Sequence, residues 1–570
     1  MLTLTLNPGF VPIIVGLLML AAPRMARGPM MAGAALLALW LLLDREFGAA
    51  TAMAQMGLPV VLLSLDALNR IFGIGMLIVL IALAIYTNAR RNRYEDAAIL
   101  MLAGGSVSTL FVGDPISFVA AASLSGLAAA WTVFAAPQEH GNRAGVRLLI
   151  WHGLEGLLFL VGVALHLTAN AGNSAWGQLN AGSFGGACIF AALMIRVGAP
   201  MAHVWFKDVV SHASPAGGAA LSAFTTSVGL YALARHFPAE PLLVPIGAAM
   251  IVGGAFYASA EDDMRRAAAY AQMAQNGVCV ALIGVGSPLS LAAAEGHAFT
   301  TVLAFAALQM TLGGMLERGG AMRVTQLVGA ARAMPLSAFL MLGAGLAATA
   351  APLFAMYATQ SVALDATATW DLRVLWALIA ALPPVLFIAL ALRSTLAANQ
   401  PIAPAPLRNE APFMMLLGAG LLIFLSLSVG LAPRWLYDLM PAELAFQPYS
   451  IDRLAPQVAM LGVSGLAYMA LRFTSVAPRR QPARILDLDA LYRGPVANAG
   501  RWAGVVLLRF YGAWQAATAT AARAAVTQIG LWARACDQPF RFTSVANLAQ
   551  MVSIAAVLVI ILLFVKVRAA

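Results

Sequence analysis

The chain has 570 residues, of which 61% are hydrophobic and only 10% are charged, with a net charge of +10. Soluble domains carry about 25% charged residues, so the composition excludes an ordinary soluble globular protein. Apolar runs of about 20 residues, long enough for a helix to cross a bilayer, recur along the sequence, whereas a membrane β-barrel would show short alternating segments.

The sequence therefore predicts an all-α polytopic membrane protein. The first apolar run starts near Pro8 with no basic residue before it, which is not the pattern of a cleavable signal peptide. Sixteen spans are predicted, near 9–22, 30–43, 67–87, 95–113, 116–136, 146–169, 183–202, 216–236, 241–260, 267–286, 291–315, 335–360, 373–393, 412–432, 455–472 and 549–566.

Basic residues mark the loops that follow odd-numbered spans, whereas the loops after even-numbered spans are neutral, acidic or mixed. Because Lys and Arg accumulate in cytoplasmic loops, we expect the odd loops to face the cytoplasm and the N-terminus to be periplasmic, in a bacterial inner membrane. The net charge then requires no nucleic-acid partner. The arginines concerned are Arg24, Arg27, Arg90, Arg91, Arg93, Arg143, Arg147, Arg265, Arg266, Arg318, Arg323, Arg332, Arg408, Arg479, Arg480 and Arg484.

Residues 473–548 break the pattern of spans. A polar loop is followed by residues 496–535, which read as one helix about 60 Å long at about 1.5 Å per residue. One interpretation is an amphipathic helix in the cytoplasmic interface, held by aromatic and arginine side chains. The other is a lateral strut that grips neighbouring subunits and ends in an anchoring span at 549–566.

Ionisable residues inside a bilayer are costly and mark function by default. His152 and Glu155 are three residues apart and so share a helix face, and Arg196 needs a partner, for which Glu155 is the nearest candidate. Histidine titrates near neutral pH and can pass protons, whereas arginine stays charged. The predicted ion or proton path residues are His152, Glu155, Arg196, His203, Asp208, His212, Glu295 and His297.

Two alternatives stay open for these residues. His152 and Glu155 could form a structural pair that packs neighbouring spans, and Lys207 and Asp208 could be the solvated end of the seventh span. Cys188, Cys279 and Cys536 lie far apart and give no metal-binding spacing. No cofactor motif is found, so we predict no metal, no cofactor and no catalytic chemistry in this chain.

Two spans look interrupted, the seventh at Gly198 and Pro200 and the twelfth at Pro352. Broken helices at matching places in two halves of a chain indicate an inverted repeat with a transport path between the halves. The predicted parts are 1–94 (N-terminal helices), 95–236 and 237–393 (the two five-helix repeats), 394–472 (C-terminal core helices), 473–548 (cytoplasmic loop and lateral helix) and 549–570 (anchor).

The stretch 200–235, PMAHVWFKDVVSHASPAGGAALSAFTTSVGLYALAR, resembles the P-L-H-x-W-L-P-D-A…P-T-P-V-S-A-L…G-x-Y-x-L-x-R signature of the antiporter-like membrane subunits of respiratory complex I and of Mrp-type cation/proton antiporters. Residues 261–284 and 296–305 and the stretch MPLSAFLMLGAGLAATAAPL also resemble segments of that family. DLDALYR resembles a segment of the D-type Mrp protein, and the long helix with its last span resembles the distal complex I subunit. The matching residues of the signature are His203, Trp205, Asp208, Pro215, Gly229, Tyr231 and Arg235.

The resemblance implies a fourteen-helix core with two inverted five-helix repeats and a proton path built on lysines. This chain departs from that path. Arg196 stands where the family has a lysine in the broken helix, and the other positions of the family's Glu and Lys residues are taken by Ser123, Ser227, Thr301 and, after the second broken helix, Ala358 and Thr359. Ser and Thr carry no charge, so we expect Ser123, Ser227, Thr301 and Thr359 to hold water instead.

Three functions remain open. The first is a membrane subunit of a multisubunit ion-translocating complex with a modified, lysine-poor proton path, whose partners are other membrane subunits, lipid, and H⁺ or Na⁺. The second is a transport-inactive structural or coupling subunit. The third is the membrane partner of a soluble enzyme, as in complex I-like hydrogenases and oxidoreductases or inorganic-carbon uptake systems.

Overall fold

The computed structural model describes residues 6–48, 50–55, 58–135, 139–170, 176–319, 322–399, 409–442, 444–474, 494–495 and 497–536. The chain divides into two compact units, Met1–Ile485 and Leu486–Ala570.

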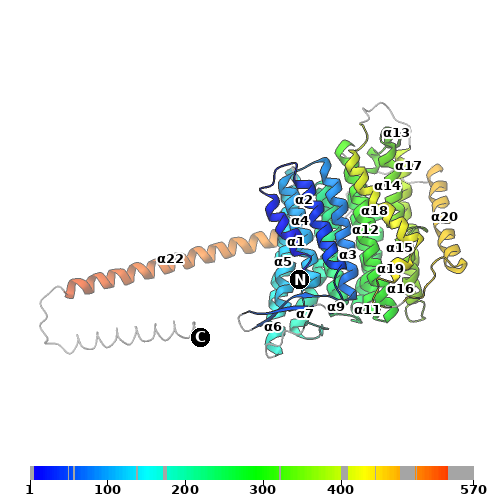
Figure 1. Cartoon of the computed structure of the whole chain (residues 1–570). Helices are drawn as coiled ribbons and strands as arrows, with labels where there is room; N and C mark the ends of the chain where they lie inside the picture. The colour runs from blue at the N-terminus through cyan, green and yellow to red at the C-terminus, as the bar shows by residue number, and fades with distance from the viewer. Residues whose placement is uncertain are drawn as a thin grey trace. The chain divides into compact units, whose positions relative to one another are not determined.

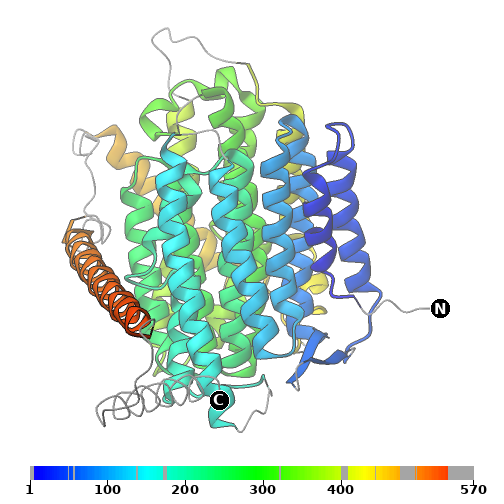
Figure 2. The same cartoon turned by 90° about the vertical axis from the view of Figure 1, so that its left-hand side faces the viewer.

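The first unit is a bundle of helices that lie side by side (Figures 1 and 2). Short segments join some of them, and a π-helical turn, Phe387–Leu392, continues α16 into α17. The helices are α1 (Phe10–Met19), α2 (Arg27–Leu43), α3 (Ala67–Tyr86), α4 (Arg93–Phe111), α5 (Pro115–Phe134), α6 (Glu139–Ala169), α7 (Phe184–Val197), α8 (Val204–His212), α9 (Pro215–His236), α10 (Leu243–Ala260), α11 (Met264–Val285), α12 (Pro288–Gly319), α13 (Ala330–Ala333), α14 (Pro335–Ala348), α15 (Ala355–Ala366), α16 (Arg373–Leu386), α17 (Arg393–Ala398), α18 (Phe413–Leu431), α19 (Arg434–Tyr437) and α20 (Ile451–Phe473).

The prediction of a polytopic all-helical membrane protein is confirmed. Ten helices in the described part of the chain are long and apolar enough to cross a membrane, and four shorter apolar helices accompany them. Each predicted span from 9–22 to 455–472 coincides with a helix or a pair of helices. The last predicted span, 549–566, lies outside the described residues.

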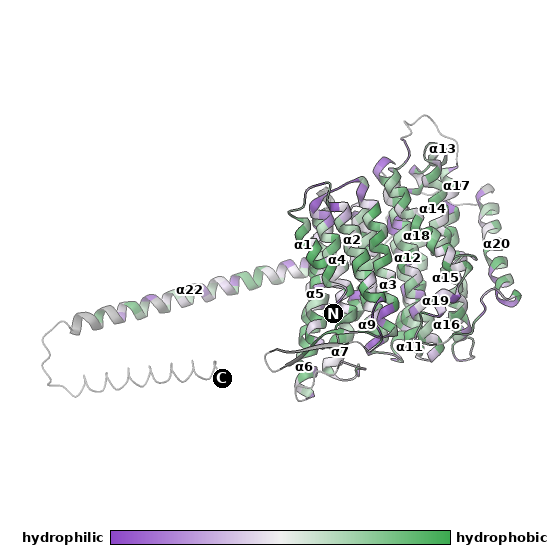
Figure 3. Cartoon of the chain, in the orientation of Figure 1, coloured by the Kyte–Doolittle hydropathy of each residue, from purple (hydrophilic) through white to green (hydrophobic). Residues whose placement is uncertain are grey.

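Contacts near the helix ends agree with the predicted alternation of the spans. At one end, Arg90 after α3 pairs with Glu317 near the end of α12 at 3.0 Å. At the other end, the amide of Ala239 after α9 donates to the carbonyl of Ile283 near the end of α11 at 2.9 Å. The first contact joins the ends of two odd-numbered spans, and the second joins the ends of two even-numbered spans. Hydrophilic residues gather near the ends of the helices and hydrophobic ones along their length (Figure 3).

A short β-hairpin between α2 and α3 departs from the all-α prediction. Strands β1 (Ala50–Gln55) and β2 (Leu58–Ser64) pair antiparallel, with Ala50 opposite Ser64. Asp114 ties the hairpin to the bundle, since one carboxylate oxygen accepts the Val61 amide at 2.8 Å. The other oxygen caps the start of α5 by accepting the Ile116 and Ser117 amides.

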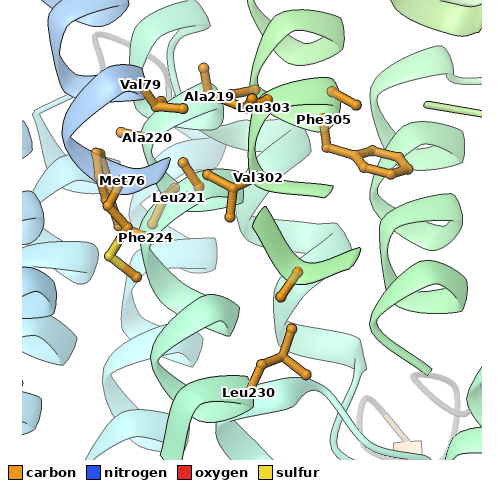
Figure 4. Close-up of a cluster of buried hydrophobic side chains, with 14 of the residues drawn as sticks. Met76, Val79, Ala219, Ala220, Leu221, Phe224, Leu230, Val302, Leu303 and Phe305 are labelled. Carbon is orange, nitrogen blue, oxygen red and sulfur yellow. The ribbon is translucent and has the colours of Figure 1, made fainter. Parts of the chain in front are cut away.

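The centre of the bundle is packed by apolar side chains of α3, α9 and α12 (Figure 4). Met76 of α3, Phe224 of α9 and Leu303 of α12 are fully buried. Small residues let other helices approach more closely: a Cβ on Gly277 of α11 would lie 2.8 Å from the Gly247 carbonyl oxygen of α10. Close backbone approach at small residues is typical of packing between membrane helices.

Both predicted helix breaks are confirmed, and they match each other. The first separates α7 from α8 and contains Pro200 and Met201; the second separates α14 from α15 and contains Pro352 and Leu353. Met201 has a φ of 76° and Leu353 a φ of 78°, a left-handed conformation that costs energy for a side chain with a Cβ. In both broken helices the strained residue directly follows the proline, so the two breaks have the same local structure.

The second unit contains α22 (Ala497–Cys536), a single helix of 40 residues. The prediction of one long helix over 496–535 is confirmed. Four of its aromatic side chains are exposed within the chain: Trp502 at 71%, Phe510 at 72%, Tyr511 at 58% and Trp514 at 63%.

Candidate functional site

Three ionisable side chains from two neighbouring helices meet inside the first unit. Glu155 of α6 accepts a hydrogen bond from the Nε of Arg196 of α7 at 2.5 Å. Its other carboxylate oxygen lies 2.6 Å from the Nδ1 of His152, one helical turn earlier. The side chains of Glu155 and Arg196 are 1% and 2% exposed. The structure thus brings together the three residues of the expected pair and its neighbouring histidine.

Helix α5 completes the surroundings of Arg196. One terminal nitrogen of the guanidinium donates to the Ser125 hydroxyl at 3.0 Å, and the other donates to the Ala122 carbonyl at 2.9 Å. A buried ion pair is stable only when its remaining donors and acceptors are also satisfied. Ser125, which the sequence did not single out, does this, while Ser123 on the same helix is half-buried. We call Glu155, Arg196, His152 and Ser125 the charged cluster.

Helix α8 places a second set of charged side chains beside α6 and α11. Asp208 pairs with Arg147 of α6 at 2.6 Å, and the ammonium of Lys207 lies 5.4 Å from the Tyr270 ring of α11. Lys207 is 6% exposed and Asp208 is 2% exposed. The alternative that this pair is a solvated helix end is therefore wrong, because the expected loop is itself a helix packed into the bundle.

The two predicted histidines of this region sit at the ends of α8. His203 is buried at the start, with its ring 6.4 Å from the ring of Tyr257. The Nδ1 of His212 lies 2.7 Å from the carbonyl oxygen of Asp208 and 3.2 Å from the Ser211 hydroxyl.

The junction between α8 and α9 is built around Arg265, a residue that sequence reasoning assigned only to a loop. Its guanidinium is buried and donates to four carbonyl oxygens, those of Val210 (2.6 Å), Ala213 (3.0 Å), Ser211 (3.1 Å) and Ser214 (3.2 Å). These are the carbonyls left over where one helix ends and the next begins. Arg265 thereby fixes the position of α8.

Replacing Arg265 by Lys is expected to lower the free energy of unfolding by about 2–4 kcal/mol, because an ammonium offers three donors and no planar fork. The loss is measured as a lower midpoint of thermal unfolding of the purified protein in detergent. Arg266→Lys is the matched control, since Arg266 is half-buried and its side chain donates to the Ser211 hydroxyl at 3.4 Å. Equal midpoints for the two variants would contradict this role of Arg265.

A second polar cluster, which we call the neutral cluster, lies between α11, α12 and α15. The ring of fully buried His297 of α12 is held at both nitrogens: Nδ1 lies 3.1 Å from the Thr359 hydroxyl and Nε2 lies 3.0 Å from the Gln275 side-chain oxygen. The Thr300 hydroxyl lies 3.1 Å from that of Thr359. Apart from the histidine, these side chains cannot be ionised.

The remaining predicted residues lie on α9 and α12. Ser227 donates to the Ala223 carbonyl of its own helix at 2.7 Å. The hydroxyl of Thr301 and one carboxylate oxygen of Glu295 are buried without a hydrogen-bond partner among the described residues. The same holds for the side chains of Thr226 of α9 and Asn276 of α11. Sequence reasoning missed Gln275 and Asn276 because neither side chain is ionisable, so neither stands out in an apolar run.

Comparison with known proteins finds a family model that matches the central part of this bundle. Residues 116–382 match the model described as NADH:quinone oxidoreductase/Mrp antiporter, transmembrane. The predicted resemblance to the antiporter-like membrane subunits is confirmed.

Among curated proteins, the chain is 34% identical to NADH-quinone oxidoreductase subunit N of Desulforudis audaxviator over 26% of this chain and 32% of that protein. It is 25% identical to NAD(P)H-quinone oxidoreductase chain 4 of Synechococcus elongatus over 51% of this chain and 59% of that protein. The chain thus spans about a third of the length of the first relative and about three-fifths of the length of the second.

Among solved structures, a chain of the Mrp complex from Dietzia sp. DQ12-45-1b superimposes with a TM-score of 0.67 at 17% identity. The superposition covers 82% of this chain and all of that one. At this identity the likeness shows a shared fold.

Proposed function

We propose that this chain, whose residues 116–382 carry the transmembrane domain of the NADH:quinone oxidoreductase/Mrp antiporter family, is a membrane subunit of a multisubunit complex that moves ions. One observation carries the proposal: the Glu155 carboxylate lies buried between the Arg196 guanidinium and the His152 ring. An ionisable triad in the interior of a membrane domain is costly to keep, and it marks an ion path by default.

The chemistry of the charged cluster suits proton transfer. Histidine and carboxylate both change protonation near the working range of a cell, whereas arginine holds its charge. A proton on the carboxylate would weaken the attraction of Glu155 for Arg196, so proton uptake and movement of Arg196 are coupled. In this scheme Arg196 is the permanent charge and His152 is the group through which Glu155 exchanges protons.

Beyond the charged cluster, the path we propose continues through hydrated relays. Buried polar atoms without protein partners are ordinarily satisfied by ordered water, and Thr226, Asn276, Thr301 and Glu295 carry such atoms on the adjacent helices α9, α11 and α12. Water held there would pass protons along hydrogen bonds at depths where lysines would carry a charge. The relays are His203, Asp208, His212, Glu295 and His297, with Ser123, Ser227, Thr301 and Thr359 holding water.

The setting of the subunit is also part of the proposal. The loops after odd-numbered spans are basic, which favours their lying on the cytoplasmic side of a bacterial inner membrane. The N-terminus would then be periplasmic. The alternating Arg and aromatic side chains of α22 suit a lateral helix on the cytoplasmic face. Its partners are other membrane subunits, and the ion is H⁺, with Na⁺ as the alternative.

One observation favours a second candidate, a structural or coupling subunit that has lost transport. Gln275, Thr300 and Thr359 cannot be ionised, so the neutral cluster has one titratable side chain, His297, among the four that form it. A subunit of this kind would transmit movement to its partners without moving ions itself.

Purification of the full chain from native membranes tests the proposal. We expect further membrane subunits to co-purify, and we expect the reconstituted complex to acidify or alkalinise vesicles when its driving reaction or ion gradient is supplied. Co-purification without ion movement would favour the second candidate, and a chain that purifies alone would contradict both.

A further inference from the structure

A large cavity opens at the end of the bundle where α18 leads into α20. Its volume is about 990 Å³, and it is lined by residues within 433–440 and 444–449, among them Tyr437, Met440, Phe446 and Tyr449. The charged lining residues are Arg434 and Asp438, one of each sign. A cavity of this size is large enough for several water molecules, and its balanced charge favours ions of neither sign.

Tyrosine hydroxyls fasten the cavity wall to the second broken helix. Tyr437 donates to the Ala358 carbonyl at 3.2 Å, and Tyr357 donates to the Pro448 carbonyl at 2.9 Å. Tyr449 donates to the Gly430 carbonyl at 2.6 Å, and burial raises the pKa of its hydroxyl, so it stays protonated. Ala358 is the neighbour of Thr359, and the wall therefore adjoins the neutral cluster.

Met440 fills the space between the cavity and the neutral cluster. It lines the cavity, yet it is only 7% exposed. A Cβ on Gly296 would lie 2.1 Å from the Met440 methyl carbon and 3.2 Å from the Thr359 methyl. The methionine thus sits in the notch that this glycine leaves in α12, next to His297.

We propose that this cavity is a water-filled vestibule leading to His297 and Thr359, and that Met440 is the side chain that closes it. This proposal rests on the proposed function, because the vestibule would connect the neutral cluster to one side of the membrane for ion movement. A hydrophobic constriction blocks water by dewetting, and a methionine with three rotatable bonds can leave its notch without movement of the backbone.

Access to Thr359 can be measured without any ion movement. The Thr359→Cys variant is made in the full chain with the native cysteines replaced by Ser, and membranes opened on both sides are treated with a charged methanethiosulfonate. We expect slow labelling of Thr359→Cys alone and labelling faster by about tenfold or more when Met440→Ala is added, because the constriction is removed. Met440→Leu should leave labelling slow.

Met250→Ala is the matched control, because Met250 is 3% exposed and lies on α10 against Gly277, remote in sequence from the cavity lining. Equal labelling with and without Met440→Ala overturns Met440 as the barrier, and so does equal acceleration by Met250→Ala. If Met440→Ala does not fold, Met440→Val should give a smaller acceleration, and its absence overturns the proposal. Since labelling reads access alone, a failure here is distinct from a failure of ion movement.

Discussion

Replacing Arg196 by Leu is expected to lower the free energy of unfolding by about 3–5 kcal/mol, because it leaves the Glu155 carboxylate buried and unpaired. The double variant Glu155→Leu/Arg196→Leu should recover most of this loss, since a buried pair replaced by apolar side chains is often neutral. The measurement is the thermal unfolding midpoint of the purified protein in detergent, for both single variants and the double variant.

The exposed pair of Arg434 and Asp438 provides the matched control. Their side chains are 89% and 68% exposed and 3.8 Å apart, and exposed pairs contribute about 0–1 kcal/mol. Arg434→Leu should therefore leave the midpoint nearly unchanged. Equal effects of Arg196→Leu and Arg434→Leu would show that the charged cluster is hydrated and open in the membrane.

The charged cluster could be predicted from sequence because ionisable side chains inside a membrane span cost free energy and so stand out in an apolar run. Glu155 and Arg196 lie in apolar runs, and the order of the spans predicts that they are neighbours. The hydrogen bond of 2.5 Å between the Arg196 Nε and the Glu155 carboxylate agrees with this prediction. The partner serine was not predictable in the same way. Ser123 and Ser125 are both small residues on α5, and only the rotation of that helix decides that Ser125 faces Arg196.

Other features could not be predicted from sequence because they depend on residues that are distant along the chain. Residues 204–212 look like a polar connection, and they form α8 because Arg265, more than fifty residues away, satisfies the carbonyls at its end. The strands 50–55 and 58–64 pair in a hairpin that is tied to the bundle by a hydrogen bond from the Val61 amide to the distant Asp114 carboxylate. Gln275 is an ordinary neutral residue until the fold places it against His297.

Replacing Glu155 by Gln is expected to reduce ion movement by the reconstituted complex by about a hundredfold or more, the usual scale for loss of a proton-transferring group. The amide keeps the size of the side chain and still accepts a hydrogen bond from Arg196, so assembly should persist. It cannot bind or release a proton. The measurement is the initial rate of pH change in vesicles at equal amounts of assembled complex.

Glu240→Gln is the matched control, because Glu240 is half-buried in the loop between α9 and α10 and makes no ion pair among the described residues. It should leave the rate unchanged. A normal rate in Glu155→Gln would mean that the charged cluster serves packing alone, as the alternative of a structural His152–Glu155 pair holds. A normal rate in Glu155→Gln together with a loss of stability in Arg196→Leu would establish that alternative, because the triad would then bind the helices together without passing protons.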